Sequence, residues 1–174
     1  MVLLTSEKYI KENSGLDDNL FGKFLLPAMK EAQEIGLQQI IGTKLYKSLQ
    51  KKIKDNTIRE NEKYEMLLNL YIQPYLKYRV LTDIIPIIGS KLSNMGAVIS
   101  NDEHIVHLGE TEKANLMEYW GFRANFYCKR MQEFILEYRD DFAEVDEKCC
   151  NQINANLYSM SDCGIWLGGI RGRK

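Results

Sequence analysis

The feature that most constrains the fold of this chain is the stretch between residues 16 and 49, LDDNLFGKFLLPAMKEAQEIGLQQIIGTKLYKSL. Its apolar residues recur at intervals of three and four, as they do along the buried face of an amphipathic helix. They are Phe21, Phe24, Leu25, Ala28, Met29, Ala32 and Ile35, followed after the break by Leu45, Leu49 and Ile53. Gly42 interrupts the pattern, and Thr43 is expected to cap a second helix that ends near Lys54. The stretch predicts packed helices and offers no group suited to catalysis.

Composition bounds the class of protein. A chain of 174 residues is ordinarily one domain that buries about two-thirds of its unfolded surface. Hydrophobic residues make up 45% of it, which is enough for a core and argues against general disorder. With 23 basic and 24 acidic residues, its net charge of −1 creates no global attraction to nucleic acid or membrane. Its ten tyrosines fit either the rim of a core or a protein interface.

The compartment follows from the apolar runs and the cysteines. No run approaches the roughly 18–20 apolar residues of a membrane span, and the beginning, MVLLTSEKYIKE, lacks the features of a signal peptide. We therefore expect a cytosol-like, reducing compartment. There the four cysteines, Cys128, Cys149, Cys150 and Cys163, would be free thiols.

Prolines and capping residues suggest further helices. A short helix is expected from Thr5 or Ser6 to about residue 11. Asp17 and Asp18 would cap the first long helix, in which Pro27 predicts a kink or a later start near residue 26. A third long helix is expected to start near residue 59, to bend at residue 74 and to end at residue 86, since prolines occupy the last two positions. Its expected inward residues are Tyr64, Leu67, Leu68, Tyr71, Ile72, Tyr75, Leu76 and Val80.

A fourth long helix should begin at residues 110–112, with a break at residues 138–141 and a last helix over residues 142–158. Its inward residues are expected to be Leu116, Tyr119, Trp120, Tyr127, Met131, Phe134 and Ile135. The predicted fold class is mainly α. It is a single domain over residues 1–174, built as a bundle of four to five helices, some of them kinked at proline.

Two segments break the helical rhythm. Between residues 87 and 109 there are turn-forming residues and two short β-like runs, which suggest a hairpin with its tip at residues 100–103. An insertion this long is either disordered or built to contact another molecule, and we favour contact. The glycine-rich arm over residues 159–174 holds one apolar cluster, Ile165, Trp166 and Leu167, which should dock on its own domain or on a neighbour. The basic end, Arg171, Arg173 and Lys174, could contact DNA or an acidic partner.

Candidate chemical sites have simpler explanations. His104 and His107 are three apart and would point to opposite faces of a strand, so a zinc site would need distant cysteines. Cys163 has no evident histidine partner, and the paired aspartates fit helix capping. No glycine-rich phosphate loop precedes a helix. A helix-turn-helix at residues 38–49 would lack a basic recognition helix. We expect no enzyme, no cofactor and no metal.

Four stretches together resemble a known family: LLTSEKYIKENSGLDDN, LLPAMKEAQEIGLQQIIGTKLYKSL, LLNLYIQPYLKYRVLTDIIP and LSNMGAVIS. The chain is similar to the head–tail connector (adaptor) proteins of tailed bacteriophages, and most closely to those from phages of Bacteroidota, including crAss-like phages. The resemblance covers residues 3–167 and rests on packing and turn patterns.

This resemblance implies a structural virion protein in the neck of the particle, made in the cytoplasm of the host bacterium. Such proteins form a homo-oligomeric ring, usually of twelve copies, below the portal protein. The ring extends the DNA channel without sequence specificity and docks the next tail or neck component, with no membrane involved. By position, the hairpin is 92–107 and the arm is 164–174. The implied interface residues are Met95, Val98, Ile99, Ile105 and Val106 in the hairpin and Ile165, Trp166 and Leu167 in the arm.

Connector channels often have a strongly acidic lining, whereas this chain is nearly neutral overall. Two alternatives from other functional classes stay open. One is a helical adaptor or regulatory protein that binds a single protein partner without forming a ring. The other is a small DNA-binding regulator, whose retention on DNA would be sensitive to salt.

Overall fold

The computed structural model describes residues 2–14, 22–88, 91–93, 96–98 and 109–145. Its main helices are α1 (Glu7–Ser14), α2 (Gly22–Glu31), α3 (Gln38–Ile41), α4 (Thr43–Lys54), α5 (Glu62–Met66), α6 (Gln73–Ile88) and α7 (Glu110–Glu137). Short helical segments are η1 (Ala32–Leu37), η2 (Ile58–Glu60), η3 (Leu67–Ile72) and η4 (Arg139–Asp141). The fold is mainly α, as the sequence predicts.

Two long helical rods contain a wider turn of π-helix. Residues 22–41 run through α2, η1 and α3, and residues 62–88 run through α5, η3 and α6. At the end of each π segment a backbone N–H bonds five residues back, from Gln38 to the carbonyl of Gln33 and from Gln73 to the carbonyl of Leu68. Each rod stays helical through its π segment.

The prolines are accommodated inside the rods. Pro74 follows η3 directly and has no N–H, and in a regular α-helix its ring would crowd the carbonyl of Leu70. The wider turn just before it relieves that crowding. Pro27 lies inside α2, which begins at Gly22 and not near residue 26. The predicted end at Pro86 is wrong, because α6 continues to Ile88.

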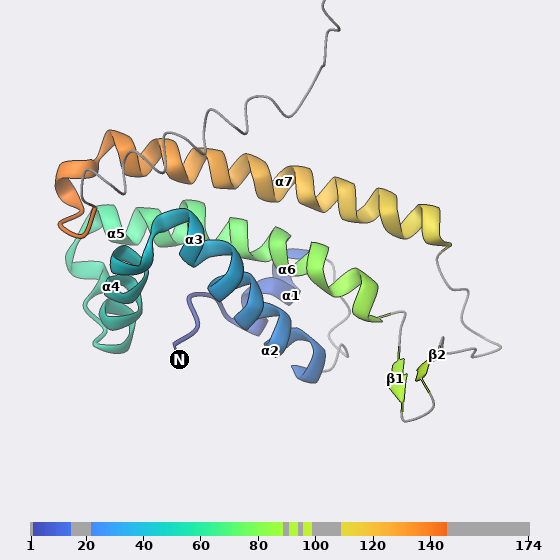
Figure 1. Cartoon of the computed structure of the whole chain (residues 1–174). Coiled ribbons are helices and arrows are strands. Elements are labelled where there is room, and N and C mark those ends of the chain that lie inside the picture. Colours follow the sequence, from blue (N-terminus) through green and yellow to red (C-terminus); the bar gives the residue numbers. More distant parts are fainter. Residues whose placement is uncertain (1, 15–21, 89–90, 94–95, 99–108, 146–174) are drawn as a thin grey trace, which may run out of the picture.

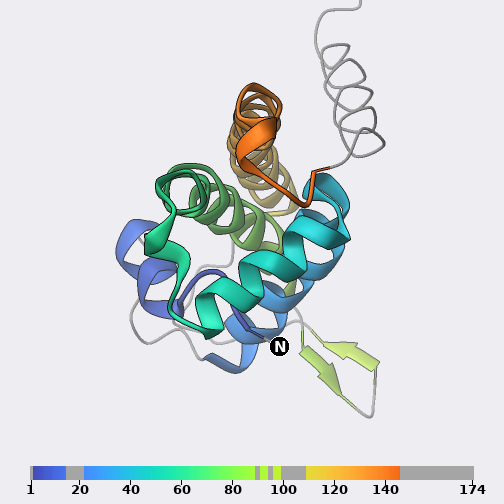
Figure 2. The ribbon, with the colours of Figure 1, turned by 90° about the vertical axis from the view of Figure 1, so that its left-hand side faces the viewer.

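Helix α7 lies along α6, and both views in Figures 1 and 2 show the two helices side by side. Stacked rings join them: the Tyr78 ring lies 5.8 Å from that of Trp120 and 5.6 Å from that of Tyr127. The ring of Tyr71 in η3 stacks on Phe134 at 4.7 Å. These ring contacts hold the longest helix of the described structure against the second rod.

The core lies where α2, α4, α6 and α7 meet, and the predicted apolar faces supply most of it. Its fully buried residues include Leu25, Met29, Leu37, Ile41, Leu45, Leu49, Leu67, Ile72, Leu76, Met131 and Ile135. Phe24 and Ile53 are only partly buried at its edge. Phe21 lies outside the described residues.

Two predicted inward residues point outward. Ile35 is 59% exposed and Tyr119 is 47% exposed. Ile35 lies within η1, whose wider turn shifts the inward positions, so that Gln33 and Leu37 are buried in its place. Tyr119 lies on the outer side of α7, beside Trp120, which packs inward.

Helix boundaries follow local capping. The Ser6 hydroxyl accepts a hydrogen bond from the Tyr9 N–H at 3.1 Å, which supports Ser6 as a cap for α1. Asn61 caps α5 by accepting from the Lys63 N–H at 3.0 Å, so that helix starts later than predicted. Thr43 is not a cap: Gly42, at φ 81°, holds the N-cap position.

The buried side-chain amide of Gln33 holds the N-terminal segment against the helices. The Leu4 N–H donates to the Gln33 side-chain oxygen at 2.8 Å, and the Gln33 amide nitrogen donates to the Val2 carbonyl at 2.9 Å. The same nitrogen lies 2.9 Å from the hydroxyl of Tyr46. Gln33 is fully buried, so these bonds satisfy a polar group that burial would otherwise penalise.

Two short stretches of the structure bear on the predicted insertion and on the predicted last helix. Strands β1 (Lys91–Ser93) and β2 (Gly96–Val98) pair antiparallel, with Leu92 opposite Ala97. This hairpin lies beyond the end of α6 (Figure 1), and the predicted tip at residues 100–103 lies outside the described residues. The break at η4 is confirmed, but Phe142 is extended and buried and does not start a helix. Residues beyond 145 lie outside the described structure.

Candidate assembly surface

The outer side of α7 carries three exposed aromatic residues, which we call the aromatic face: Tyr119, Phe122 and Phe126. Their exposed fractions are 47%, 72% and 51%. They are spaced by three and four residues and so lie on one side of the helix, away from the ring contacts with α6. Clustered exposed aromatics mark interaction sites more often than lone apolar residues do.

Two arginines flank the aromatic face. The Arg123 guanidinium carbon lies 3.5 Å above the Tyr119 ring centroid, and its Nη1 donates to the Tyr119 carbonyl at 3.4 Å. The guanidinium of Arg130 lies 5.7 Å from the Phe126 ring and 5.5 Å from that of Tyr71. These cation–π contacts favour defined ring positions before any partner arrives. Aromatic residues and arginine are also the types enriched among the energetic centres of interfaces.

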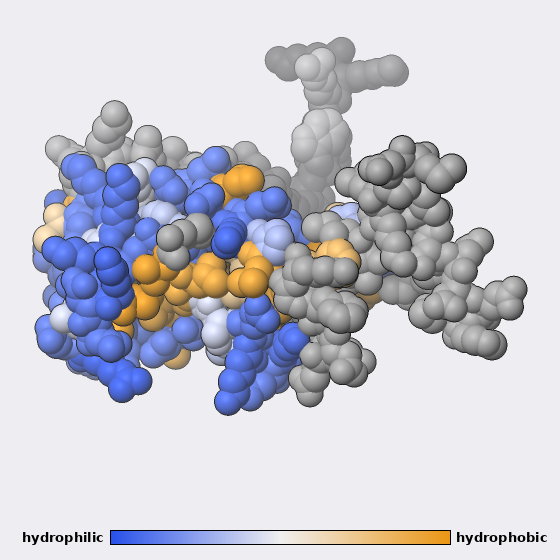
Figure 3. Space-filling model, turned by 90° about the horizontal axis from the view of Figure 1, so that it is seen from below, coloured by the Kyte–Doolittle hydropathy of each residue, from blue (hydrophilic) through white to orange (hydrophobic). Residues whose placement is uncertain are grey.

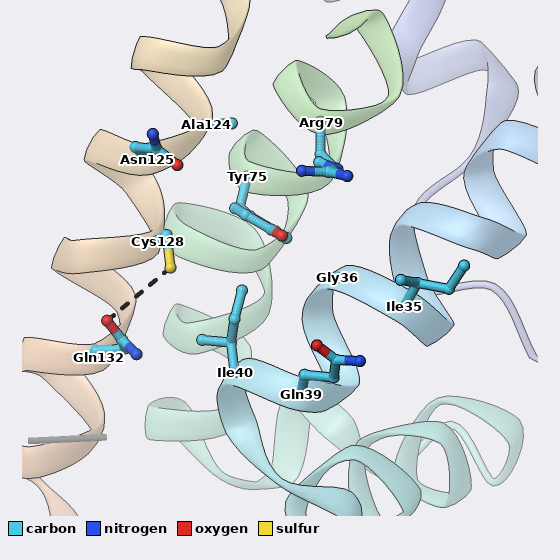
Figure 4. Close-up of a pocket in the computed structure, with 10 residues that line it drawn as sticks. All are labelled: Ile35, Gly36, Gln39, Ile40, Tyr75, Arg79, Ala124, Asn125, Cys128 and Gln132. Carbon is cyan, nitrogen blue, oxygen red and sulfur yellow. Dashed lines mark hydrogen bonds between the residues drawn. The ribbon is translucent and has the colours of Figure 1, made fainter. Parts of the chain in front are cut away.

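A second feature is a cavity of about 390 Å³ between η1 and α3, α6 and α7. Figure 4 shows Gln39 and Ile40 on one wall, with Cys128 and Gln132 of α7 on the other. The Cys128 thiol donates to the Gln132 side-chain oxygen at 3.9 Å. The Gln132 amide nitrogen has no hydrogen-bond partner in the described structure, although the residue is only 1% exposed.

The cavity offers little for catalysis. Burial raises the pKa of the Cys128 thiol to about 11, so it stays protonated and weakly nucleophilic at neutral pH. Burial also raises the pKa of Tyr75 well above its ordinary value. Arg79 on the rim is paired with Asp83 at 2.9 Å. Within the described ranges, no cluster of three or more His, Cys, Asp or Glu side chains could hold a metal ion.

A carboxylate near residue 145 joins two helices through hydrogen bonds. Glu144 accepts hydrogen bonds from the Ser48 hydroxyl of α4 and from the Tyr64 hydroxyl of α5, the latter at 2.5 Å. Burial alone would raise the pKa of Glu144, but these two bonds, a bond from its own backbone N–H and the charge of Lys52 together outweigh it and hold the pKa below its ordinary value. The Tyr64 ring also packs edge-on against Phe142 at 5.0 Å.

Most of the interface residues implied by the resemblance cannot be compared with this geometry. Val98 lies in β2. The others, Met95, Ile99, Ile105, Val106, Ile165, Trp166 and Leu167, lie outside the described residues, as do Arg171, Arg173 and Lys174. The same holds for both histidines and for Cys149, Cys150 and Cys163. Cys128 is a free thiol, as predicted.

Sequence reasoning missed Phe122 and Phe126. Their spacing with Tyr119 repeats the rhythm of a buried face, and a second apolar stripe on a helix that already has one was the available signal.

The face opposite α7 has a different character. Seen from below in Figure 3, it is mainly hydrophilic, with an apolar band across its middle. No helix within the described part of the chain is both long and apolar enough to cross a membrane.

Comparison with known proteins gives a family and no function. Residues 37–155, well over half of the 174 residues, match the model of a family of unknown function, DUF6712. The match runs from the end of η1 through the hairpin and the whole of α7. No curated protein and no solved structure matches the chain. The chain therefore belongs to the DUF6712 family.

Proposed function

We propose that this protein is a structural component of a bacteriophage virion, a non-enzymatic head–tail connector. In this proposal its copies form a ring, usually of twelve, below the portal protein. The ring joins the capsid to the tail and extends the channel through which DNA passes. The protein acts in the neck of the particle after synthesis in the host cytoplasm.

The observation that carries the proposal is the aromatic face of α7. Three exposed rings with flanking arginines form a surface that the described part of the chain leaves open to solvent. A ring subunit needs two different patches that fit each other, because its contacts are heterologous. The aromatic face would be one of them, supported by the stacked rings between α6 and α7.

The hairpin and the arm would supply the remaining contacts. Val98 and its neighbours Met95, Ile99, Ile105 and Val106 would meet the adjacent copy or the portal. In the arm, Trp166 and Leu167, with Ile165, would be apolar anchors, and the basic end would contact DNA or an acidic partner. The resemblance of the sequence to connector proteins supports these roles.

The experiment combines purified portal protein with the full chain and counts copies by native mass spectrometry and negative-stain imaging. A ring of about a dozen copies on the portal is expected. Phe122→Ser with Phe126→Ser should prevent the ring. A matched control, Leu70→Ser, removes another apolar side chain that is 53% exposed but lies outside the aromatic face. A truncation ending at Ser161 tests the arm.

Other outcomes would replace the proposal. A complex of one copy with one partner and no ring would favour the helical adaptor. Salt-sensitive retention on DNA without any portal binding would favour the DNA-binding regulator. Absence of the chain from purified virions would exclude a connector role.

A further inference from the structure

The aromatic face is the centre of a longer seam on the outer side of α7. Exposed residues follow one another there at alternating steps of three and four, which is the spacing of a coiled-coil contact line. The seam consists of Glu112, Asn115, Tyr119, Phe122, Phe126, Lys129 and Glu133, all of them exposed. Its middle is apolar, and its two ends carry charge.

We propose that two copies of the isolated protein associate through this seam, with their α7 helices antiparallel. In the register that fits best, Tyr119 of each copy lies opposite Phe122 of the other. The four central rings then pack about a two-fold axis. The same register brings Glu112 opposite Lys129 of the second copy, once at each end of the contact. The central rings and the charged ends are therefore matched at the same time, while Phe126 lies opposite Asn115 of the second copy.

Charge disfavours the other arrangements. A parallel pair would place Glu112 beside Glu112 and Lys129 beside Lys129 of the second copy. Sliding the antiparallel pair by one heptad would bring Arg123 of each copy to the same flank of the seam and would place Tyr119 opposite Lys129. Like charges in such positions are destabilising. The sequence of charges along the seam thus selects one direction and one register.

The association should be weak. The stretch between Glu112 and Lys129 is about 26 Å of helix at about 1.5 Å per residue, which is a small contact for two proteins. A dissociation constant between about 1 µM and 1 mM is expected for an interface of this size. The pairing is two-fold and needs only the free chain, so it goes beyond the ring contact and can be tested without the portal.

The test is sedimentation equilibrium of the full chain over a range of concentrations, with charge reversals at both ends of the seam. Glu112→Lys or Lys129→Glu alone places like charges opposite each other twice per dimer and should weaken association at least tenfold. The double reversal restores opposite charges and should recover the dimer.

Because the Glu112 side chain also accepts a hydrogen bond from the Gly109 N–H at 2.7 Å, which caps α7, Lys129→Glu is the decisive single reversal. Glu110→Lys is the control for reversing a charge in the first turn of α7. It changes the same charge in the same turn, but Glu110 lies off the seam and pairs with Lys113 at 2.7 Å. It should leave association unchanged. Circular dichroism of each variant verifies that α7 is retained.

A chain that stays monomeric at every concentration would overturn the proposal. So would a dimer that ignores both single reversals, or one that the double reversal fails to restore. Ring formation is measured separately, on the portal and with the Phe122→Ser, Phe126→Ser variant, so the two proposals can fail separately.

Discussion

Gly36 faces the hydroxyl of Tyr75 on the wall of the cavity, and this contact allows a quantitative test of the packing (Figure 4). A Cβ added at Gly36 would lie 2.7 Å from the Tyr75 hydroxyl oxygen, closer than Cβ atoms normally approach any atom. Tyr75 is only 4% exposed, so its ring can yield only toward the cavity that it lines. Gly36→Ala therefore combines a gain in helix propensity with overpacking.

The two contributions can be separated with a second glycine. Alanine is favoured over glycine inside a helix by about 1 kcal/mol, and overpacking a core costs about 1–3 kcal/mol. Gly121 lies inside α7, and a Cβ there would meet nothing within 4 Å. Gly121→Ala should stabilise the protein by up to about 1 kcal/mol. Gly36→Ala should leave it about 1–3 kcal/mol less stable than Gly121→Ala.

Urea denaturation followed by circular dichroism measures both free energies of unfolding. In a Tyr75→Phe background the hydroxyl is gone and the nearest ring carbon is 3.7 Å from the added Cβ, so Gly36→Ala should become neutral or stabilising. The reasoning is refuted if Gly36→Ala stabilises the original protein as much as Gly121→Ala does.

Three further outcomes are expected. Because the folded state lowers the pKa of Glu144, its stabilising contribution is present above the ordinary carboxyl pKa and lost as pH falls through the folded value. Glu144→Gln should therefore flatten the acid side of a plot of stability against pH, measured by thermal unfolding. Gln33→Leu leaves the Leu4 N–H without its acceptor and should cost about 2–3 kcal/mol in urea denaturation, with faster hydrogen exchange at that amide. Asn61→Ala removes the cap of α5 and should lower the free energy of unfolding by about 1 kcal/mol, whereas Asn115→Ala, at an exposed position inside α7, should not lower it.

Local patterns predicted most of the helices because burial follows periodicity. The expected boundaries of α4 agree with the structure, since Gly42 and Asp55 interrupt the helix at either end. The residues that the spacing predicts to face inward in the third helix are buried, except Tyr71, which lies at the edge of the core. These positions depend only on which side of a helix meets the core.

Other features depend on contacts between distant parts of the chain. Ile35 was expected inside, but η1 shifts the helical phase and Gln33 is buried because it meets the backbone of residues 2 and 4. The spacing of apolar residues does not reveal this hydrogen-bond partner. The pairing of β1 with β2 likewise depends on a partner strand, because several turn-forming residues compete between Gly89 and Asp102.

The same limit applies to the candidate site. A sequence with two apolar stripes on one helix cannot tell which stripe meets the core, and Tyr119 was assigned to the wrong one. The structure resolves this because Tyr78 and Tyr71 fix the inner side of α7 through ring stacking. The outer stripe is then available for another molecule.

The two π segments have a consequence for how insertions and deletions would act on this protein. Each segment resets the rotation of its rod partway along, so that α2 packs on α6 while α3, further along the same rod, reaches α7. One helix thereby serves two neighbours without an intervening loop. Removing one residue from η3 would turn α6 by about 100° relative to α5 and carry Tyr78 away from Trp120. In these two stretches the number of residues matters more than their identity, and length changes elsewhere in the turns should be far easier to tolerate.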